Sequence, residues 1–369
     1  MAKVKFGLIG AGNIARVHAW AARVAPLSFE DLDRNDIEYV GVYNRTKSKA
    51  DFIRDKFGFG FSTSNVDELL DSGVNAVSVT LANFLHLEMV EKAAERNLAI
   101  LCEKPLEINL ERARKMLEIT SKKNLITATA LVMRFMPSVI FAKKLIDSGK
   151  LGKIYHYRAV VAHSRYINPN LPLEWRMIKA QAGGGALADI GIHLIDLANY
   201  LVGDISEVSS IARTFIKERK TRSGEIGIVD VEDAAIMMFS FKNGALGSIE
   251  ATRFGPGFQE LDRVEIHGSN GMIRFYLENP FEIYLCLLDE EYPGVKRIIL
   301  KPWEKALWPP SKSITGWAFL FVALYHEFFR AVIEGRKAKP DFEDAVKAQE
   351  VLEAAYISAG ERRWVSLPL

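Results

Sequence analysis

The sequence predicts an α/β domain with a doubly wound parallel sheet over residues 1–126, followed by an α+β domain with an open, mostly antiparallel sheet over 127–369. Three observations predict this arrangement. The chain has 369 residues, more than one compact core usually organises. In its first third, single helices alternate with strand-like apolar runs, as in parallel sheets. After about residue 150, alternating apolar and polar positions with hairpin signals indicate antiparallel strands.

Short apolar runs predict the strands of the first domain, at 4–9, 37–43, 76–81, 98–102 and 125–132. Helices are expected between them, at 13–24, 47–56, 85–96 and 110–122. One helix between successive strands implies right-handed crossovers. The segment 26–36 lengthens the first crossover, and we expect a surface loop there.

The second domain is expected to be built mainly from strands, at 154–163, 205–216, 232–241, 245–253, 260–267, 271–276, 281–287 and 296–300. Asn243-Gly244 and Asn270-Gly271 predict tight turns between neighbouring strands. A helix at 187–202 is expected to cover one face of the sheet. Helices at 317–334 and 341–359 are expected to pack back onto the fold.

Composition narrows the classes of partner. Lys and Arg total 48 against 46 for Asp and Glu, so the formal charge of +2 favours neither nucleic acid nor a membrane surface. Cys102 and Cys286 are far apart and read as small buried hydrophobes, and no metal site is expected. The segment 317–333 carries His326, Glu327 and Arg330 and is too short and polar to span a bilayer. With no signal-peptide pattern at the N-terminus, we expect a cytoplasmic protein.

Residues 10–15, G-A-G-N-I-A, match the G-x-G-x-x-G/A fingerprint between a strand and a helix. Gly10 permits the tight turn, and Gly12 lets the backbone approach a pyrophosphate, beside Asn13 and Ile14 at the helix start. This context predicts a dinucleotide-binding Rossmann domain. The alternative is a tight turn that binds no ligand.

The end of the second strand bears on the choice of cofactor. An acidic residue usually holds the ribose 2′-hydroxyl of NAD there, but this chain has Asn44, Arg45 and Lys49. Cationic and hydroxyl groups suit a 2′-phosphate, so we expect NADP, with NAD as the alternative. A solvated basic loop would also explain the pattern.

Two further motifs complete a set with the fingerprint: E-K-P at 103–105 and G-G-G-A-L-x-D-x-G-x-H-x-x-D at 183–196. In this order, they resemble the glucose–fructose oxidoreductase / inositol dehydrogenase (Gfo/Idh/MocA) family over nearly the whole chain. W-R at 175–176 and T-R-F at 252–254 resemble its sugar and inositol dehydrogenase branch.

The motifs supply candidate catalytic residues. Glu103 and Lys104 end a strand of the doubly wound sheet, where ligands bind. The resemblance implies that Lys104 contacts the substrate hydroxyl beside the nicotinamide, and Glu103 is expected to hold either the Lys104 ammonium or the nicotinamide ribose. Asp189 and His193 are four residues apart and so share one face of the expected helix. The resemblance places this pair at the substrate.

Other positions have less specific support. The cofactor is expected to contact residues after the third and fifth strands and a pair from the second domain: Thr80, Leu81, Asn83, His86, Arg134, Trp175 and Arg176. Substrate selection is expected from residues after the 154–163 strand, with surface positions as the alternative: His163, Arg165, Tyr166 and Lys179. A structural role is expected for the remaining candidates: Asp196, His18, His156, His267 and His326.

The resemblance implies hydride transfer between a nicotinamide cofactor and a secondary alcohol or ketone of a sugar, cyclitol or related polyol. An ordinary lysine is almost fully protonated at pH 7, whereas an ordinary histidine is mostly neutral, so His193 oriented by Asp189 is the first choice of base. Lys104 would then stabilise alkoxide charge, although it could itself be the base. Alternatives are a glycosidase with transient oxidation, a physiological reductase, and a non-catalytic dinucleotide sensor. An open sheet predicts a homodimer or homotetramer.

Overall fold

The computed structural model describes residues 3–257, 261–300 and 316–369, which fall into two compact units. Of the described residues, the first unit contains 3–107, 111–135 and 316–346, and the second contains 108–110, 136–257, 261–300 and 347–369. None of the described helices is long and apolar enough to cross a membrane.

A six-stranded parallel sheet forms the first unit, in the order β3-β2-β1-β4-β5-β6. Its strands are β1 (Val4–Ile9), β2 (Ile37–Tyr43), β3 (Phe61–Thr63), β4 (Ala76–Val79), β5 (Ala99–Cys102) and β6 (Thr127–Thr129). The order reverses between β1 and β4. Ligands of doubly wound sheets bind at such a reversal, outside the carboxyl ends of the strands.

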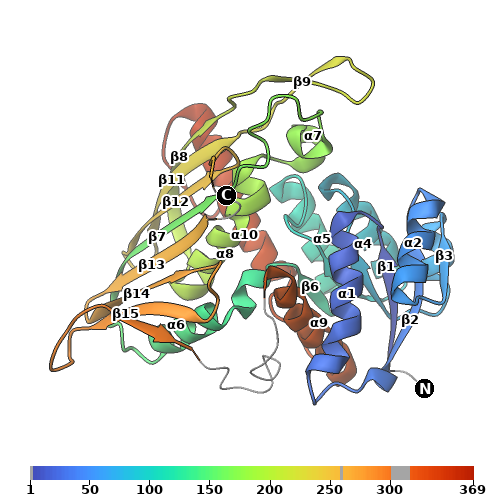
Figure 1. The fold of residues 1–369 in the computed structure, drawn as a ribbon, viewed down its shortest axis with the longest axis horizontal. Helices are drawn as coiled ribbons and strands as arrows, with labels where there is room; N and C mark the ends of the chain where they lie inside the picture. Colours follow the sequence, from blue (N-terminus) through green and yellow to red (C-terminus); the bar gives the residue numbers. More distant parts are fainter. Residues whose placement is uncertain (1–2, 258–260, 301–315) are drawn as a thin grey trace. The chain divides into compact units, whose positions relative to one another are not determined.

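The helices of this unit follow the expected alternation. They are α1 (Asn13–Ser28), η1 (Arg34–Asp36), α2 (Lys47–Phe57), α3 (Val66–Leu70), η2 (Asn83–Leu85), α4 (His86–Glu95), α5 (Leu110–Lys122), η3 (Val132–Phe135) and α9 (Trp317–Glu334). Helix α9 lies beside α1 (Figure 1). The segment expected as a surface loop is partly helical, because α1 continues through Pro26 to Ser28 and η1 precedes β2.

The second unit is built on a nine-stranded sheet in the order β16-β15-β14-β13-β7-β12-β11-β8-β17. Its strands are β7 (Ile154–Ala162), β8 (Ile205–Arg213), β11 (Ala234–Phe241), β12 (Leu246–Thr252), β13 (Leu261–Gly268), β14 (Gly271–Tyr276), β15 (Glu282–Leu287), β16 (Lys296–Ile299) and β17 (Val365–Ser366). Strands β7 and β12 pair in parallel, and the other pairs of the described sheet are antiparallel. Residue 260, expected as the start of a strand, lies outside the described residues.

Side-chain alternation divides this sheet into two faces. Tyr157, Phe239 and Ile249 point inward and are buried, while Arg158 and Glu250 point outward and are exposed. Helix α8 (Ile192–Leu201) packs on the inner face against β7 and β12, and the Tyr157 hydroxyl donates to the Leu194 carbonyl at 2.9 Å. The expected covering helix is therefore present, and the predicted fold class is confirmed (Figure 1).

The remaining elements of this unit are α6 (Pro137–Asp147), η4 (Trp175–Met177), α7 (Lys179–Ala182), β9 (Glu218–Lys220), β10 (Ile226–Ile228) and most of α10 (Phe342–Glu361). The expected strand 205–216 ends earlier, at Arg213, because the chain leaves the sheet there to form the β9–β10 hairpin. The expected helix 187–202 begins as a π-helical turn, Leu187–Gly191.

Candidate functional site

The fingerprint forms a turn whose geometry depends on its glycines. Gly10 has φ of +115°, and a Cβ at this position would lie 2.5 Å from Thr80 Oγ1. A Cβ on Gly12 would meet no atom within 4 Å, so the chain faces open space at the start of α1. No side chain caps that helix N-terminus. Exposed backbone N–H groups and the helix dipole at this point fit the pyrophosphate of a dinucleotide.

The chain after β2 lies against the fingerprint. The Asn44 side chain accepts the Ala11 N–H at 3.2 Å and donates to the Thr46 carbonyl at 3.1 Å, which commits both ends of its amide to the loop. Arg45 and Lys49 are exposed. Lys47, by contrast, is held by Asp51 and Ser62. Arg45 and Lys49 are thus two cations near this loop that remain exposed to a ligand.

Glu103 and Lys104 follow β5 directly. Glu103 is buried, and its Oε1 accepts from His18 Nε2 at 2.8 Å while its Oε2 accepts the Lys104 backbone N–H at 3.0 Å. Burial acts to raise the pKa of Glu103, but the hydrogen bond and charge of His18 and the charge of Lys104 outweigh it, so that this pKa is lowered. An ionised Glu103 therefore anchors the backbone of the candidate catalytic lysine.

Residues expected near the cofactor have varied surroundings. The Thr80 hydroxyl donates to the Ile9 carbonyl at 3.0 Å and supports the turn at Gly10. His86 is buried between the carbonyls of Leu81, 3.2 Å from Nε2, and Leu106, 3.0 Å from Nδ1. It therefore ties the loop after β4 to the loop after Lys104. Asn83, on the same loop as Leu81, is buried.

Arg134, expected to reach the cofactor, forms an ion pair with Asp344 at 3.3 Å. Burial acts to raise the pKa of Asp344, and the Arg134 charge helps to lower it overall. The sequence offered no sign of this pairing, because the two residues are far apart in the chain.

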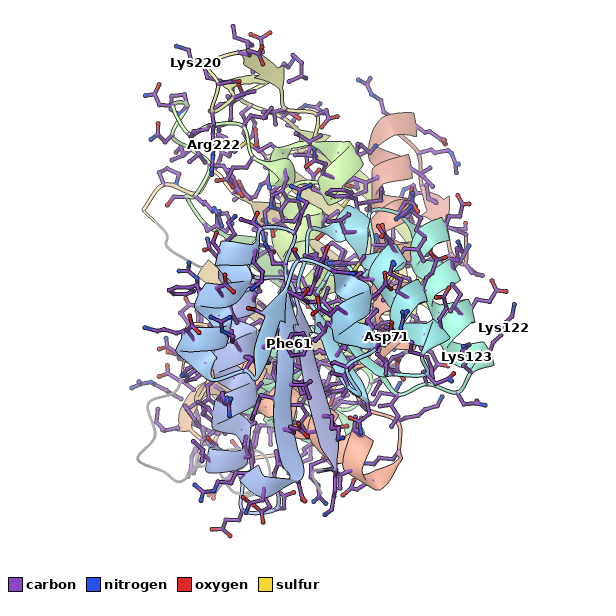
Figure 2. The ribbon with its side chains drawn as sticks, turned by 90° about the vertical axis from the view of Figure 1, so that its right-hand side faces the viewer. Phe61, Asp71, Lys122, Lys123, Lys220 and Arg222 are labelled. Atoms are coloured by element: carbon purple, nitrogen blue, oxygen red, sulfur yellow. The ribbon has the colours of Figure 1, made fainter. Side chains whose placement is uncertain are left out.

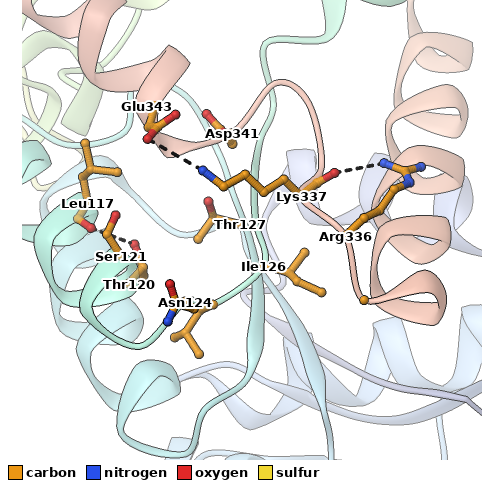
Figure 3. A pocket seen from close by; sticks show the side chains of 12 residues that line it. Leu117, Thr120, Ser121, Asn124, Ile126, Thr127, Arg336, Lys337, Asp341 and Glu343 are labelled. Carbon is orange, nitrogen blue, oxygen red and sulfur yellow. Dashed lines mark hydrogen bonds and ion pairs between the residues drawn. The ribbon is translucent and has the colours of Figure 1, made fainter.

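A pocket of about 290 Å³ lies elsewhere in the first unit (Figure 3). Its lining comes from the end of α5, the residues leading into β6 and the segment after α9, and includes Thr120, Asn124, Thr127, Lys337 and Glu343. Lys337 Nζ lies 3.9 Å from a carboxylate oxygen of Glu343, and both side chains are exposed. Because it adjoins the amino end of β6, the pocket is not at the edge where dinucleotides bind.

In the second unit, the three glycines at 183–185 pack closely against Ile108, Tyr356 and the Glu232 backbone, respectively, and the Glu232 carboxylate is buried beside them. Glu232 accepts the N–H groups of Gly185 and Leu187, both at 2.8 Å, and the Tyr356 hydroxyl at 3.0 Å. A Cβ on Gly185 would lie 1.8 Å from the Glu232 carbonyl oxygen. Burial raises the pKa of Glu232, although the hydrogen bonds from the Gly185 and Leu187 N–H groups act to lower it. The glycines therefore permit close packing within the protein.

The π-helical turn carries Asp189, and His193 follows on α8. Such turns are rare and are frequently found at functional sites. Asp189 lies between two guanidinium groups, with Arg176 Nε at 3.7 Å and Arg253 Nη1 at 3.8 Å. His193 is buried and Asp189 is partly exposed. The turn thus presents a carboxylate held among cations.

Arg253 is fully buried, and its guanidinium carbon lies 4.4 Å from the centre of the Tyr166 ring. Among the residues that the structure describes, neither Arg253 Nε nor the Tyr166 hydroxyl has a hydrogen-bond partner. Both atoms are shielded from solvent, and buried polar atoms without partners are costly. Trp175 stacks on Arg176, whose guanidinium carbon is 4.3 Å from its ring.

His163 and Arg165 begin the loop that leads to Tyr166. His163 Nδ1 accepts the Arg165 backbone N–H at 3.2 Å, which leaves the Nε2 atom to carry the proton of the neutral ring. Burial lowers the pKa of His163, although the negative charge of Asp189 acts to raise it. Arg165 is exposed and pairs with Glu174 at 3.3 Å, and Lys179 is exposed at the start of α7.

Sequence reasoning missed Glu232, Arg253 and Tyr356. The first two had a detectable signal, since E-D at 232–233 and R at 253 interrupt otherwise apolar strand patterns. Arg253 was noticed only as part of a branch signature. Tyr356 lies on a helix among many apolar residues, and nothing in its own segment indicates its contact with Glu232.

Comparisons with known proteins bear on both units. Residues 4–130 match a model described as "Oxidoreductase family, NAD-binding Rossmann fold", and residues 143–367 match one described as "Oxidoreductase family, C-terminal alpha/beta domain". Levoglucosan dehydrogenase of Pseudarthrobacter phenanthrenivorans is 33% identical over 100% of this chain and 99% of its own. Inositol 2-dehydrogenase of Rhizobium meliloti is 25% identical over 99% of each.

A solved structure titled levoglucosan dehydrogenase in complex with NADH and L-sorbose superposes with a TM-score of 0.94 at 33% identity, covering 99% of each chain. These matches confirm the resemblance drawn from the three motifs. The chain belongs to the Gfo/Idh/MocA oxidoreductase family.

Proposed function

We propose that this oxidoreductase interconverts a secondary alcohol and a ketone on a sugar or cyclitol, with a nicotinamide dinucleotide as redox partner. The observation that carries the proposal is the placing of Lys104 on an ionised, buried Glu103 at the carboxyl end of β5. The fingerprint at Gly10–Gly12 follows β1 in the same sheet. Relatives named for levoglucosan and inositol support the substrate class.

The first unit holds the cofactor in this proposal. Backbone N–H groups at the start of α1 would bind the pyrophosphate, and the nicotinamide, once bound, supplies the acceptor or donor of hydride. Lys104 would donate a hydrogen bond to the reacting hydroxyl and stabilise negative charge as it develops on that oxygen. The Glu103 contact to its backbone limits how far the lysine backbone can shift.

The second unit contributes the groups that move the proton. We propose His193 as the base that takes the hydroxyl proton, with Asp189 orienting the ring or the substrate. The Asp189 carboxylate lies near two guanidinium groups, and an ionised carboxylate can only accept hydrogen bonds. Arg176 and Asp189 are both partly exposed and offer polar groups that suit a substrate rich in hydroxyls.

The dinucleotide is proposed to be NADP in preference to NAD. No carboxylate stands at position 44, and Arg45 and Lys49 are exposed beside the fingerprint loop. The Asn44 amide is already committed to Ala11 and Thr46, which weakens it as a receptor for a ribose 2′-hydroxyl. Solved relatives are titled as complexes with NADH, so this preference would set the chain apart from them.

The protein is also proposed to be a homodimer or homotetramer through the outer face of the nine-stranded sheet. Ile236, Met238 and Leu246 are about half or more exposed there, at 46%, 54% and 60%. Covering such apolar side chains favours association.

A substrate panel tests the proposal. Sugars, cyclitols and anhydrosugars would each be incubated with NAD and NADP, and reduced cofactor would be followed by absorbance. We expect sustained absorbance with at least one cyclic polyol. Bond cleavage without net absorbance would indicate a glycosidase, and binding of dinucleotide without turnover of any compound would refute the dehydrogenase.

A further inference from the structure

The chain leaves the nine-stranded sheet after Arg213 and returns at Ala234, and residues 214–233 form an arm that ends in the β9–β10 hairpin (Figure 1). Lys220 and Arg222 lie on its outer part (Figure 2). The arm has no part in the mechanism proposed above.

One side chain of the hairpin is buried. Arg219 is 3% exposed, whereas its neighbours Glu218 and Lys220 are exposed. Its guanidinium donates to the carbonyl oxygens of Asn168 at 2.6 Å, of Leu171 at 3.3 Å, and of Tyr166. All three acceptors belong to the segment 163–174, here named the substrate loop because it begins with His163 and Arg165.

The partners of Arg219 are carbonyl oxygens and not carboxylates. Burial lowers the pKa of this guanidinium, although the more distant charge of Asp233 acts against that change. Placing a cation in the interior without a paired anion is costly. A planar fork of N–H donors is suited to hold several carbonyls in one fixed arrangement. These hydrogen bonds from Arg219 therefore hold the backbone of the substrate loop in one arrangement.

Apolar packing strengthens the same contact. Tyr166, Met177, Val229 and Val231 form a buried cluster, with Leu171, Leu173 and Phe254 packed against it. The Leu173 N–H donates to the Lys220 carbonyl at 2.8 Å. A Cβ on Gly227 would lie 2.6 Å from Leu173 Cδ2, so the hairpin backbone lies close to this leucine. The arm and the substrate loop thus share one small core.

This core leads to the candidate catalytic groups. Arg219 holds the backbone of Tyr166, and the ring of Tyr166 supports Arg253 at 4.4 Å. Arg253 in turn lies 3.8 Å from the Asp189 carboxylate. Arg253 also donates to the carbonyls of Arg176 and Glu232, so a shift of the substrate loop would change its packing on one side and thereby disturb a guanidinium that helps to fix Asp189.

We infer that Arg219 is a positioning residue that clasps the substrate loop and thereby determines which ring substituents of the substrate are accepted. The inference rests on the proposed function. Arg219 touches neither reacting atoms nor cofactor in this account. It acts by fixing Tyr166, and through it Arg253 and Asp189.

The test compares Arg219→Lys with the control Arg222→Lys, an exposed arginine of the same arm. Lysine keeps the charge but loses the fork. The two substrates differ only at carbons away from the oxidised one. We expect Arg219→Lys to reduce the preference for the better substrate, measured as the ratio of the two kcat/KM values, at least fivefold and mainly through KM. NADPH binding should change less than twofold, and the control should match wild type.

A partly unfolded variant lowers activity toward both substrates alike, so the ratio separates positioning from a loss of folded enzyme. An unchanged ratio in a folded Arg219→Lys enzyme would overturn the inference. If Arg219→Lys does not fold, Leu173→Ala thins the same core without exposing a buried charge and should narrow the ratio in the same direction. An unchanged ratio in that variant overturns the inference as well.

Hydrogen exchange gives a readout that needs no substrate, so it remains decisive even if the wild type turns over no compound of the panel. Backbone amides of residues 163–174 should exchange at least tenfold faster in Arg219→Lys than in wild type or Arg222→Lys. Equal exchange in all three proteins would refute the clasp, whereas absent turnover alone would refute only the proposed function.

Discussion

His18 Nε2 lies 2.8 Å from Glu103 Oε1, and both side chains are buried. An ionised carboxylate only accepts hydrogen bonds, so Nε2 carries the proton. The other ring nitrogen faces the hydroxyls of Ser78 and Tyr325, each at 3.0 Å. Through Glu103, a histidine on the helix that follows the fingerprint is therefore connected to the backbone of Lys104. The histidine expected to be only structural holds a candidate catalytic segment.

Glu103→Gln should lower the free energy of unfolding by about 2 kcal/mol at pH 7, because it weakens a buried charge-assisted hydrogen bond. The folded-state pKa of Glu103 is lowered, so its ionisation stabilises the fold above the ordinary glutamic acid value of about 4.3 and this contribution is lost as the pH falls below it. Urea unfolding of both proteins should show a constant difference in the free energy of unfolding from pH 6 to 8, and this difference should shrink as the pH falls below about 4.3. A difference that grows in acid would contradict the ionised state.

Lys104→Ala should lower kcat on the order of 100-fold or more, because the group that stabilises charge on the reacting oxygen is lost. The dissociation constant of the dinucleotide should change little. Steady-state kinetics and fluorescence titration measure the two quantities. Lys122→Ala, at the exposed end of α5, is the matched control. Normal turnover in Lys104→Ala would remove the lysine from the site.

His193→Ala should abolish the acidic limb of the pH–rate profile for alcohol oxidation, since that limb is expected to report protonation of the base. Asp189→Asn should shift the limb or depress the rate, because the carboxylate among Arg176 and Arg253 is lost. The measurement is kcat/KM from pH 5 to 10. Survival of the limb in His193→Ala would transfer the role of base to Lys104 or another group.

Wild type should prefer NADP over NAD by at least about tenfold in kcat/KM, a difference of ~1.4 kcal/mol. Asn44→Asp combined with Arg45→Ala should reverse the preference, since a carboxylate accepts the 2′-hydroxyl and repels a 2′-phosphate. Lys47→Ala is the control, because this lysine is already held by Asp51 and Ser62. Equal or better use of NAD by wild type would refute the 2′-phosphate interpretation.

His163 should make the protein less stable as the pH falls. Burial lowers its folded-state pKa, although Asp189 opposes this, so below about pH 6.5 the unfolded chain binds a proton that the folded chain does not. The free energy of unfolding should therefore decrease between pH 7 and 5.5, and His163→Gln should reduce that decrease. Denaturant titrations of wild type and His163→Gln measure this pH dependence. The reference is pH 8, at which the imidazole is neutral in both the folded and the unfolded chain.

Local patterns predicted most long elements, although the helix α6 over Pro137–Asp147 was missed. The bounds of β2 and α5 agree with the expected ranges because each carries a clear run or period. Strand β3 and the β9–β10 hairpin were missed, since three residues are too few to show alternation. The three motifs also indicated the family, but the partners of their residues come from distant segments. The sequence near Gly185 does not predict its contact with Glu232, and the sequence near Glu103 does not predict its contact with His18.

The packing of the glycine segment has a practical consequence for changing the enzyme's substrate range. A methyl group at Gly184 or Gly185 would lie 1.8 Å from the Tyr356 hydroxyl or the Glu232 carbonyl, respectively, so libraries that vary these positions would mostly encode misfolded protein. Diversity is better placed at Arg165 and Ile167, whose side chains are exposed on a backbone that Arg219 secures. A fixed hairpin thus leaves a short, tolerant stretch in which new specificities can be selected.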